Sequence, residues 1–245
     1  MNFEEYNENY KEAILLLKDF GGCCRKVNQY IIQLKNEVFS YLVEKSLDTF
    51  LSILLLIEKF QLSDAHCLSR VLLENVVNFI YLSKFKDKIS DYKSSEMKIM
   101  KSLWEKISID TKHMKEPYKL SRLIDDEMVK DYQSAAKIAK EYRQLYGQDK
   151  WTSISFIDKA TAIGLYIFYV EYKKESSLIH SNWFDHREVS VHHSFYSLVV
   201  SSMVLMQWLL ESLNSELSES IDPILNECMQ IRKRVIYQSE ISELE

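Results

Sequence analysis

The sequence predicts an all-α protein, a single-domain helical bundle of about seven to nine helices over 1–245. Glycine and proline are scarce, at 4 and 2 of 245 residues, and β-rich or α/β chains need more turn residues. Apolar residues recur at helical spacing through most of the chain. A chain of this length can also bury a substantial core, so helices joined by short polar loops are expected.

Two helical segments are expected at the start of the chain. Apolar spacing predicts a helix over 3–19, and the glycine pair at 21–22 is expected to end it. A long helical segment is predicted over 25–60, with 45–46 as the candidate position of a break. Its part over 48–60 is apolar on most faces and should lie at the centre of the bundle.

A helix over about 64–86 is expected next, with Ser63 or Asp64 as its cap. Four of its polar residues recur at i+4, so that neighbours in the series share a face: His66, Arg70, Glu74 and Asn78. Arg70 and Glu74 are close enough along the helix to pair. Because a buried charge is costly unless it is paired, they are expected to form a structural salt bridge or to face a shared cavity.

The middle of the chain is polar and lysine-rich, and we expect 87–150 to be a helical excursion packed on the main bundle. Helices are then predicted over 155–180 and 186–214, and Gly164 would allow another helix to approach the first of these closely. Pro223 is expected to precede or open a final helix. The predicted central bundle consists of helices 48–60, 64–86, 155–180 and 186–214.

A polar stripe is expected near the end of the 155–180 helix, where Tyr172, Ser176 and His180 recur at i+4. Each of them interrupts an otherwise apolar helix, and burying an unpaired polar group is unfavourable. We therefore expect these three residues to converge with Arg70 and Glu74 in one binding site.

Charge and hydropathy limit the classes of partner and compartment. The net charge of −5 and the pI near 5.8 argue against general coating of DNA. The N-terminus lacks an apolar signal region, and no run reaches the roughly 18 apolar residues that a membrane span needs. We therefore expect a cytoplasmic protein that does not contact a membrane.

The four cysteines show neither a CxxC pair nor the spacing of zinc ligands. The neighbours Cys23 and Cys24 could be redox-active, but ordinary buried or surface thiols are the favoured interpretation. Reduced thiols are expected in a cytoplasmic protein.

Two blocks of residues carry a resemblance to a known family. One block is Arg70-x-x-x-Glu74 within the 64–86 helix, and the other is Trp151, Asp158-Lys159-Ala160 and Tyr172-x-x-x-Ser176-x-x-x-His180. In these blocks the chain resembles a bacterial all-helical family catalogued only as a domain of unknown function. The resemblance implies an all-helical fold and supplies no established reaction.

A second pattern lies at the predicted start of the 186–214 helix, where Arg187 precedes His192 and His193. It resembles the signature of HEPN ribonucleases, which are helical bundles that usually act as dimers. The resemblance implies a homodimer that cleaves RNA without a metal, in a toxin or phage-defence setting. Arg187, His192 and His193 would then be the catalytic residues, with His180 assisting, because histidine suits proton transfer near neutral pH.

Other functions stay open or are disfavoured by the sequence. No histidine pair has the spacing that puts two ligands on one helical turn, so no metal is expected. No phosphate-binding or dinucleotide-binding glycine motif is present, so no cofactor is expected. Ser176 as a nucleophile would need a base that the pattern does not supply. The alternative to the RNA-acting enzyme is a non-catalytic helical module that binds a protein partner.

Overall fold

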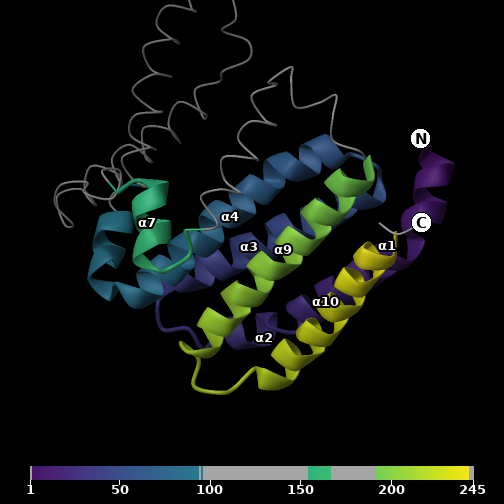
Figure 1. Ribbon diagram of the computed structural model, residues 1–245. Coiled ribbons are helices and arrows are strands. Elements are labelled where there is room, and N and C mark those ends of the chain that lie inside the picture. The colour runs from purple at the N-terminus through teal and green to yellow at the C-terminus, as the bar shows by residue number, and fades with distance from the viewer. Residues whose placement is uncertain (1, 94, 96–153, 167–190, 243–245) are drawn as a thin grey trace, which may run out of the picture. The chain divides into compact units, whose positions relative to one another are not determined.

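The computed structural model describes residues 2–93, 95, 154–166 and 191–242 of the chain. In that part it contains seven α-helices, one short 3-10 helix and no strand, which confirms the all-α prediction (Figure 1).

The chain divides into two compact units. One consists of Met1–Lys84 with Phe156–Glu245, and the other of Phe85–Ser155, which begins with the short helix η1 (Lys86–Lys88). The excursion predicted at 87–150 lies in the second unit and mostly outside the described residues.

The first helix, α1, runs over Phe3–Arg25 and begins with a reciprocal capping box. Asn2 Oδ1 accepts a hydrogen bond from the Glu5 amide at 2.9 Å, and Glu5 Oε2 accepts one from the Asn2 amide at 3.0 Å. The prediction that 21–22 ends this helix is wrong. A Cβ added at Gly21 would lie 3.1 Å from Leu54 Cδ1, so this glycine permits close packing on another helix.

Two helices follow, α2 over Asn28–Ile31 and α3 over Glu37–Glu58. Asn36 caps α3 by accepting a hydrogen bond from the Val38 amide at 3.0 Å. The break expected at 45–46 is wrong, because α3 is continuous there and the chain instead turns before Asn36.

The next helix, α4, runs over Leu62–Lys84 and lies beside α3. The turn between them contains Phe60 at φ 59°, and the Gln61 amide donates to the Leu56 carbonyl at 2.8 Å. The helix begins before both of the residues predicted to cap it.

A short helix, α7, runs over Phe156–Ala162 and packs against α4. It ends in two hydrogen bonds, from the Leu165 amide to Ala160 at 2.8 Å and from the Gly164 amide to Thr161 at 3.0 Å. With Gly164 at φ 80°, this is a Schellman termination. The continuous helix predicted from 155 is therefore wrong, and Gly164 ends a helix rather than admitting a neighbour.

The last two described helices are α9 (Val191–Asn214) and α10 (Asp222–Ser242), and Pro223 lies in the first turn of α10 as predicted. Helices α3, α4 and α9 pack together as expected, and α1 and α10 complete the bundle, with α10 lying against α1 and α9 (Figure 1). Large side chains fill the core, among them Tyr6, Phe20, Phe50, Phe79 and Phe195.

Helix α9 is long and apolar enough to cross a membrane, with a mean hydropathy of 1.3 over its most apolar window. That window is 56% buried inside the bundle. A core helix of a soluble protein has the same character, so this composition is weak evidence for a membrane span.

Candidate functional site

The polar series of α4, here called the polar line, runs along the helix from His66 to Asn78 and turns about 40° around it at each step of four residues. Arg70 Nε donates to Glu74 Oε1 at 3.4 Å, which confirms that the two residues pair. Their side chains keep 25% and 44% of their exposure, so solvent screens the pair and its contribution to stability is small. The Glu74 carboxylate is therefore partly exposed to solvent.

One turn further on, Asn78 meets a buried lysine from α7. Lys159 Nζ donates to Asn78 Oδ1 at 3.1 Å, and the lysine is only 8% exposed. Burial lowers the pKa of Lys159 to about 8, and the nearby charge of Glu74 partly opposes this effect. An amine with such a pKa can hold or release a proton near neutral pH.

Lys159 was not predicted as a site residue. It lies within the Asp158-Lys159-Ala160 block, but a single lysine in a short amphipathic helix is usually exposed. Only the contact with Asn78, 81 positions earlier, distinguishes it. In the sequence, the signal for Lys159 was therefore its place in the Asp158-Lys159-Ala160 block.

At its other end the same series reaches α9. His66 is buried, at 4% exposure, and its Nε2 is hydrogen bonded to Ser194 Oγ at 2.9 Å. Ser194 directly follows the two histidines His192 and His193. The polar line of α4 therefore extends from α7 to the first described turn of α9.

The two α9 histidines differ in environment. His192 is half-buried, with Nδ1 hydrogen bonded to the Tyr10 hydroxyl at 3.4 Å and its ring 4.8 Å from that of Tyr196. His193 is exposed. His192 faces Tyr10 on α1, and Ser194 faces His66 on α4. Successive residues are about 100° apart around a helix, so His193 lies about 100° from each of them. It is the better placed of the two to meet a ligand from solvent.

The remaining predicted site residues lie outside the described residues: Arg187, His180, Tyr172 and Ser176. The convergence of the last three with Arg70 and Glu74 therefore stays a prediction. Within the described ranges, no group of three His, Cys, Asp or Glu side chains is arranged to hold a metal ion.

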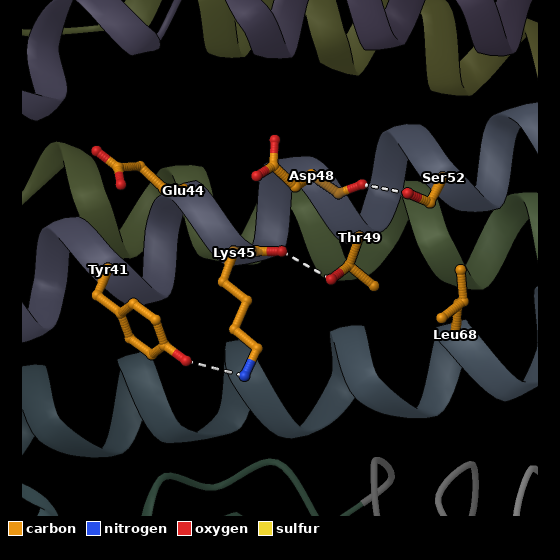
Figure 2. Close-up of a pocket in the computed structure, with 7 residues that line it drawn as sticks. All are labelled: Tyr41, Glu44, Lys45, Asp48, Thr49, Ser52 and Leu68. Carbon is orange, nitrogen blue, oxygen red and sulfur yellow. Dashed lines mark hydrogen bonds between the residues drawn. The ribbon is translucent and has the colours of Figure 1, made fainter. Parts of the chain in front are cut away.

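An open groove of about 440 Å³ lies along α3 and one residue of α4 (Figure 2). Lys45 Nζ donates to the Tyr41 hydroxyl at 3.0 Å, and Thr49 and Ser52 donate to backbone carbonyls of their own helix. None of the predicted site residues lines it. The lining residues are Tyr41, Glu44, Lys45, Asp48, Thr49, Ser52 and Leu68.

The fold and the polar line define an all-helical protein with a series of polar side chains along the core helix α4. The model of DUF5677, a family of unknown function, matches residues 36–194. The chain therefore belongs to that family, and the match includes the polar line from His66 to Ser194. No curated protein and no solved structure matches the chain.

Proposed function

We propose that this protein is a cytoplasmic effector enzyme that cleaves RNA in a toxin or phage-defence setting. The observation that supports this most is the hydrogen bond between His66 and Ser194. It holds the polar line of α4, with its cation Arg70, against the turn of α9 that follows His192 and His193. A cation and several imidazoles are thus gathered in one region of the protein.

Metal-independent cleavage of RNA needs three groups. A base accepts the proton of the 2′-hydroxyl, an acid protonates the leaving oxygen, and a cation stabilises the charge on the phosphorane. In the proposal, His193 is the exposed proton carrier, His192 is its partner held by Tyr10, and Arg187 supplies the cation. Arg70, paired with Glu74, follows His66 by one turn of α4.

The proposal includes a homodimer. One protomer offers a single Arg187 with its two histidines, and a twofold axis near them would double the positive charge and supply both acid and base. Light scattering at micromolar concentration tests this point. A strict monomer would remove the dimeric form of the site.

The central experiment compares His193→Gln with wild type for RNA cleavage by the purified protein and for growth arrest on expression. His193 is exposed, so the substitution should leave the fold intact while both effects are lost. Lys233→Ala, at an exposed position of α10, is the matched control and should behave as wild type. Circular dichroism verifies the fold of each variant.

Cleavage that survives in His193→Gln and in a His192→Ala/His193→Ala double variant would contradict the catalytic role of these histidines, and absence of cleavage by the wild type would contradict the ribonuclease proposal. The alternative is a non-catalytic module that binds a protein partner. One observation favours it: His66 and His192 are both hydrogen bonded to side chains of neighbouring helices. Buried polar contacts of this kind can specify helix register without any catalysis.

A further inference from the structure

Three of the four cysteines meet where the end of α1 lies against α10. Cys23 and Cys24 belong to the last turn of α1, and Cys228 belongs to α10. Their exposed fractions are 3%, 0% and 0%, and all three are free thiols. Residues that are distant in the sequence thus form one buried thiol cluster.

Within the cluster, Cys228 interacts with both Cys24 and Cys23, and its interaction with Cys24 has the larger effect on its pKa. Burial raises the pKa of Cys24 well above its ordinary value, and its hydrogen bond with Cys228 raises it further. The same hydrogen bond is the largest cause that lowers the pKa of Cys228. Cys24 therefore keeps its proton and donates it toward Cys228, which is the sulfur that more readily becomes a thiolate.

Cys23 has a different role. Burial raises the pKa of Cys23 to about 12, and its hydrogen bond with Glu227 adds to this effect. Glu227 also forms an ion pair with Lys26 at 2.6 Å, and both of these side chains are about half exposed. The ion pair thus lies between solvent and the cysteines.

We propose that Cys24 and Cys228 are an oxidative modification site that closes into a disulfide between α1 and α10. The oxidant is a hydroperoxide. The Cys228 thiol is first oxidised by hydrogen peroxide to a sulfenic acid, with release of one water. Cys24 sulfur then attacks the Cys228 sulfur, a second water leaves, and two thiols have been oxidised by one peroxide that is reduced to two waters.

The disulfide would join α1 and α10 covalently, where the reduced protein has helix packing, the Lys26–Glu227 ion pair and the hydrogen bonds of the cysteines. It closes a loop that spans residues 24–228, and closing a long loop restricts the unfolded chain strongly. The oxidised protein is therefore more resistant to unfolding, and a thiol reductant reverses the change. This inference is independent of the proposed ribonuclease activity.

The test treats the reduced, folded full-length protein with hydrogen peroxide, blocks remaining thiols in denaturant and maps the peptides without reduction. The expected result is a linked pair of peptides containing Cys24 and Cys228, which dithiothreitol separates. Cys67, on α4 and only partly buried, is the internal control and should remain outside the link. The oxidised protein should melt several degrees higher than the reduced protein.

Variants sharpen the test. Cys23→Ser should still form the link, whereas Cys228→Ser should lose both the link and the shift in melting temperature. Should Cys228→Ser fail to fold, the wild-type link decides the matter, and fragmentation of the linked peptide between the neighbours Cys23 and Cys24 shows which of them is joined to Cys228. Recovery of all four blocked thiols after peroxide, or a link from Cys228 to Cys23 or Cys67, would overturn the proposal.

Discussion

Helices α3 and α4 are neighbours of nearly equal length, yet the hydroxyl groups of α3 and several polar side chains of α4 find their hydrogen-bond partners in different places. Hydroxyl groups of α3 donate to backbone carbonyls one turn earlier in the same helix, at Ser40, Ser46, Thr49 and Ser52. Three polar groups of α4 instead contact other elements, although Arg70 and Glu74 pair within the helix. His66 bonds to Ser194 on α9, Asn78 accepts from Lys159 on α7, and Lys84 donates to the Ala162 carbonyl at 2.7 Å.

The difference separates a structural helix from a candidate site. A hydroxyl that is hydrogen bonded within its own helix has its partner wherever that helix packs. Its hydrogen bond therefore does not require any particular neighbouring helix. A buried imidazole or amine that bonds across helices requires two elements at a fixed position. The bonding pattern therefore locates the candidate site on α4, although the open groove lies mainly along α3.

The largest expected effect concerns the buried amine of Lys159. Its pKa is 10.5 when unfolded and about 8 when folded, so between pH 8 and 10.5 the unfolded chain binds more protons. The free energy of unfolding of wild type should therefore rise with pH in this window, by up to about 3 kcal/mol relative to Lys159→Met. Urea titrations of both proteins at several pH values measure the difference. A constant difference across the window would contradict the buried position of the amine.

The next two substitutions each remove one polar contact, on α4 a partly buried one and on α3 a buried one. Asn78→Ala removes an acceptor of Lys159 and should lower the free energy of unfolding by about 2 kcal/mol. Ser46→Ala on α3 removes a hydroxyl whose acceptor, the Leu42 carbonyl, already belongs to the helix, so the loss should stay below about 1 kcal/mol. Thermal and urea unfolding measure both. Equal losses would show that local and cross-helix contacts contribute alike.

A smaller effect on the free energy of unfolding is expected where the polar line of α4 reaches α9. Ser194→Ala removes the partner of buried His66 and should lower the free energy of unfolding by about 1 kcal/mol. The control is Ser201→Ala on the same helix, because Ser201 Oγ donates only to the local Leu198 carbonyl at 3.2 Å. Its loss should stay below about 0.5 kcal/mol. The reverse order in urea unfolding would contradict a specific α4–α9 contact.

The two cross-helix contacts mark the limit of what the sequence could predict. Helical periodicity predicted the all-α class and the i+4 pairing of Arg70 with Glu74, because both follow from spacing along one helix. The contacts of Asn78 with Lys159 and of His66 with Ser194 join residues 81 and 128 positions apart. Periodicity indicates which face of a helix is polar, but not which other helix that face will meet.

The glycines show the same limit. The pair at 21–22 was expected to end a helix, and Gly164 was expected to admit one, but the structure reverses both roles. A glycine at a close helix contact and a glycine in a left-handed cap have the same sequence signal. Only the backbone angle of Gly164 and the distance of Gly21 from Leu54 distinguish them.

The smallest expected change in stability accompanies a clear change in ionisation. Glu74 is partly exposed, so Glu74→Gln should alter the free energy of unfolding by less than about 0.5 kcal/mol. Its charge raises the pKa of Lys159, however, so removing it should move that pKa further below 8. An NMR titration of the Lys159 side chain measures the shift.

The matched control is Glu58→Gln at the end of α3, where the carboxylate pairs with Lys18 at 2.9 Å. In this variant Lys159 should titrate as in wild type. An unchanged titration in Glu74→Gln would mean that solvent screens Glu74 from Lys159, and the polar line would then be two separate contacts rather than one electrostatic unit.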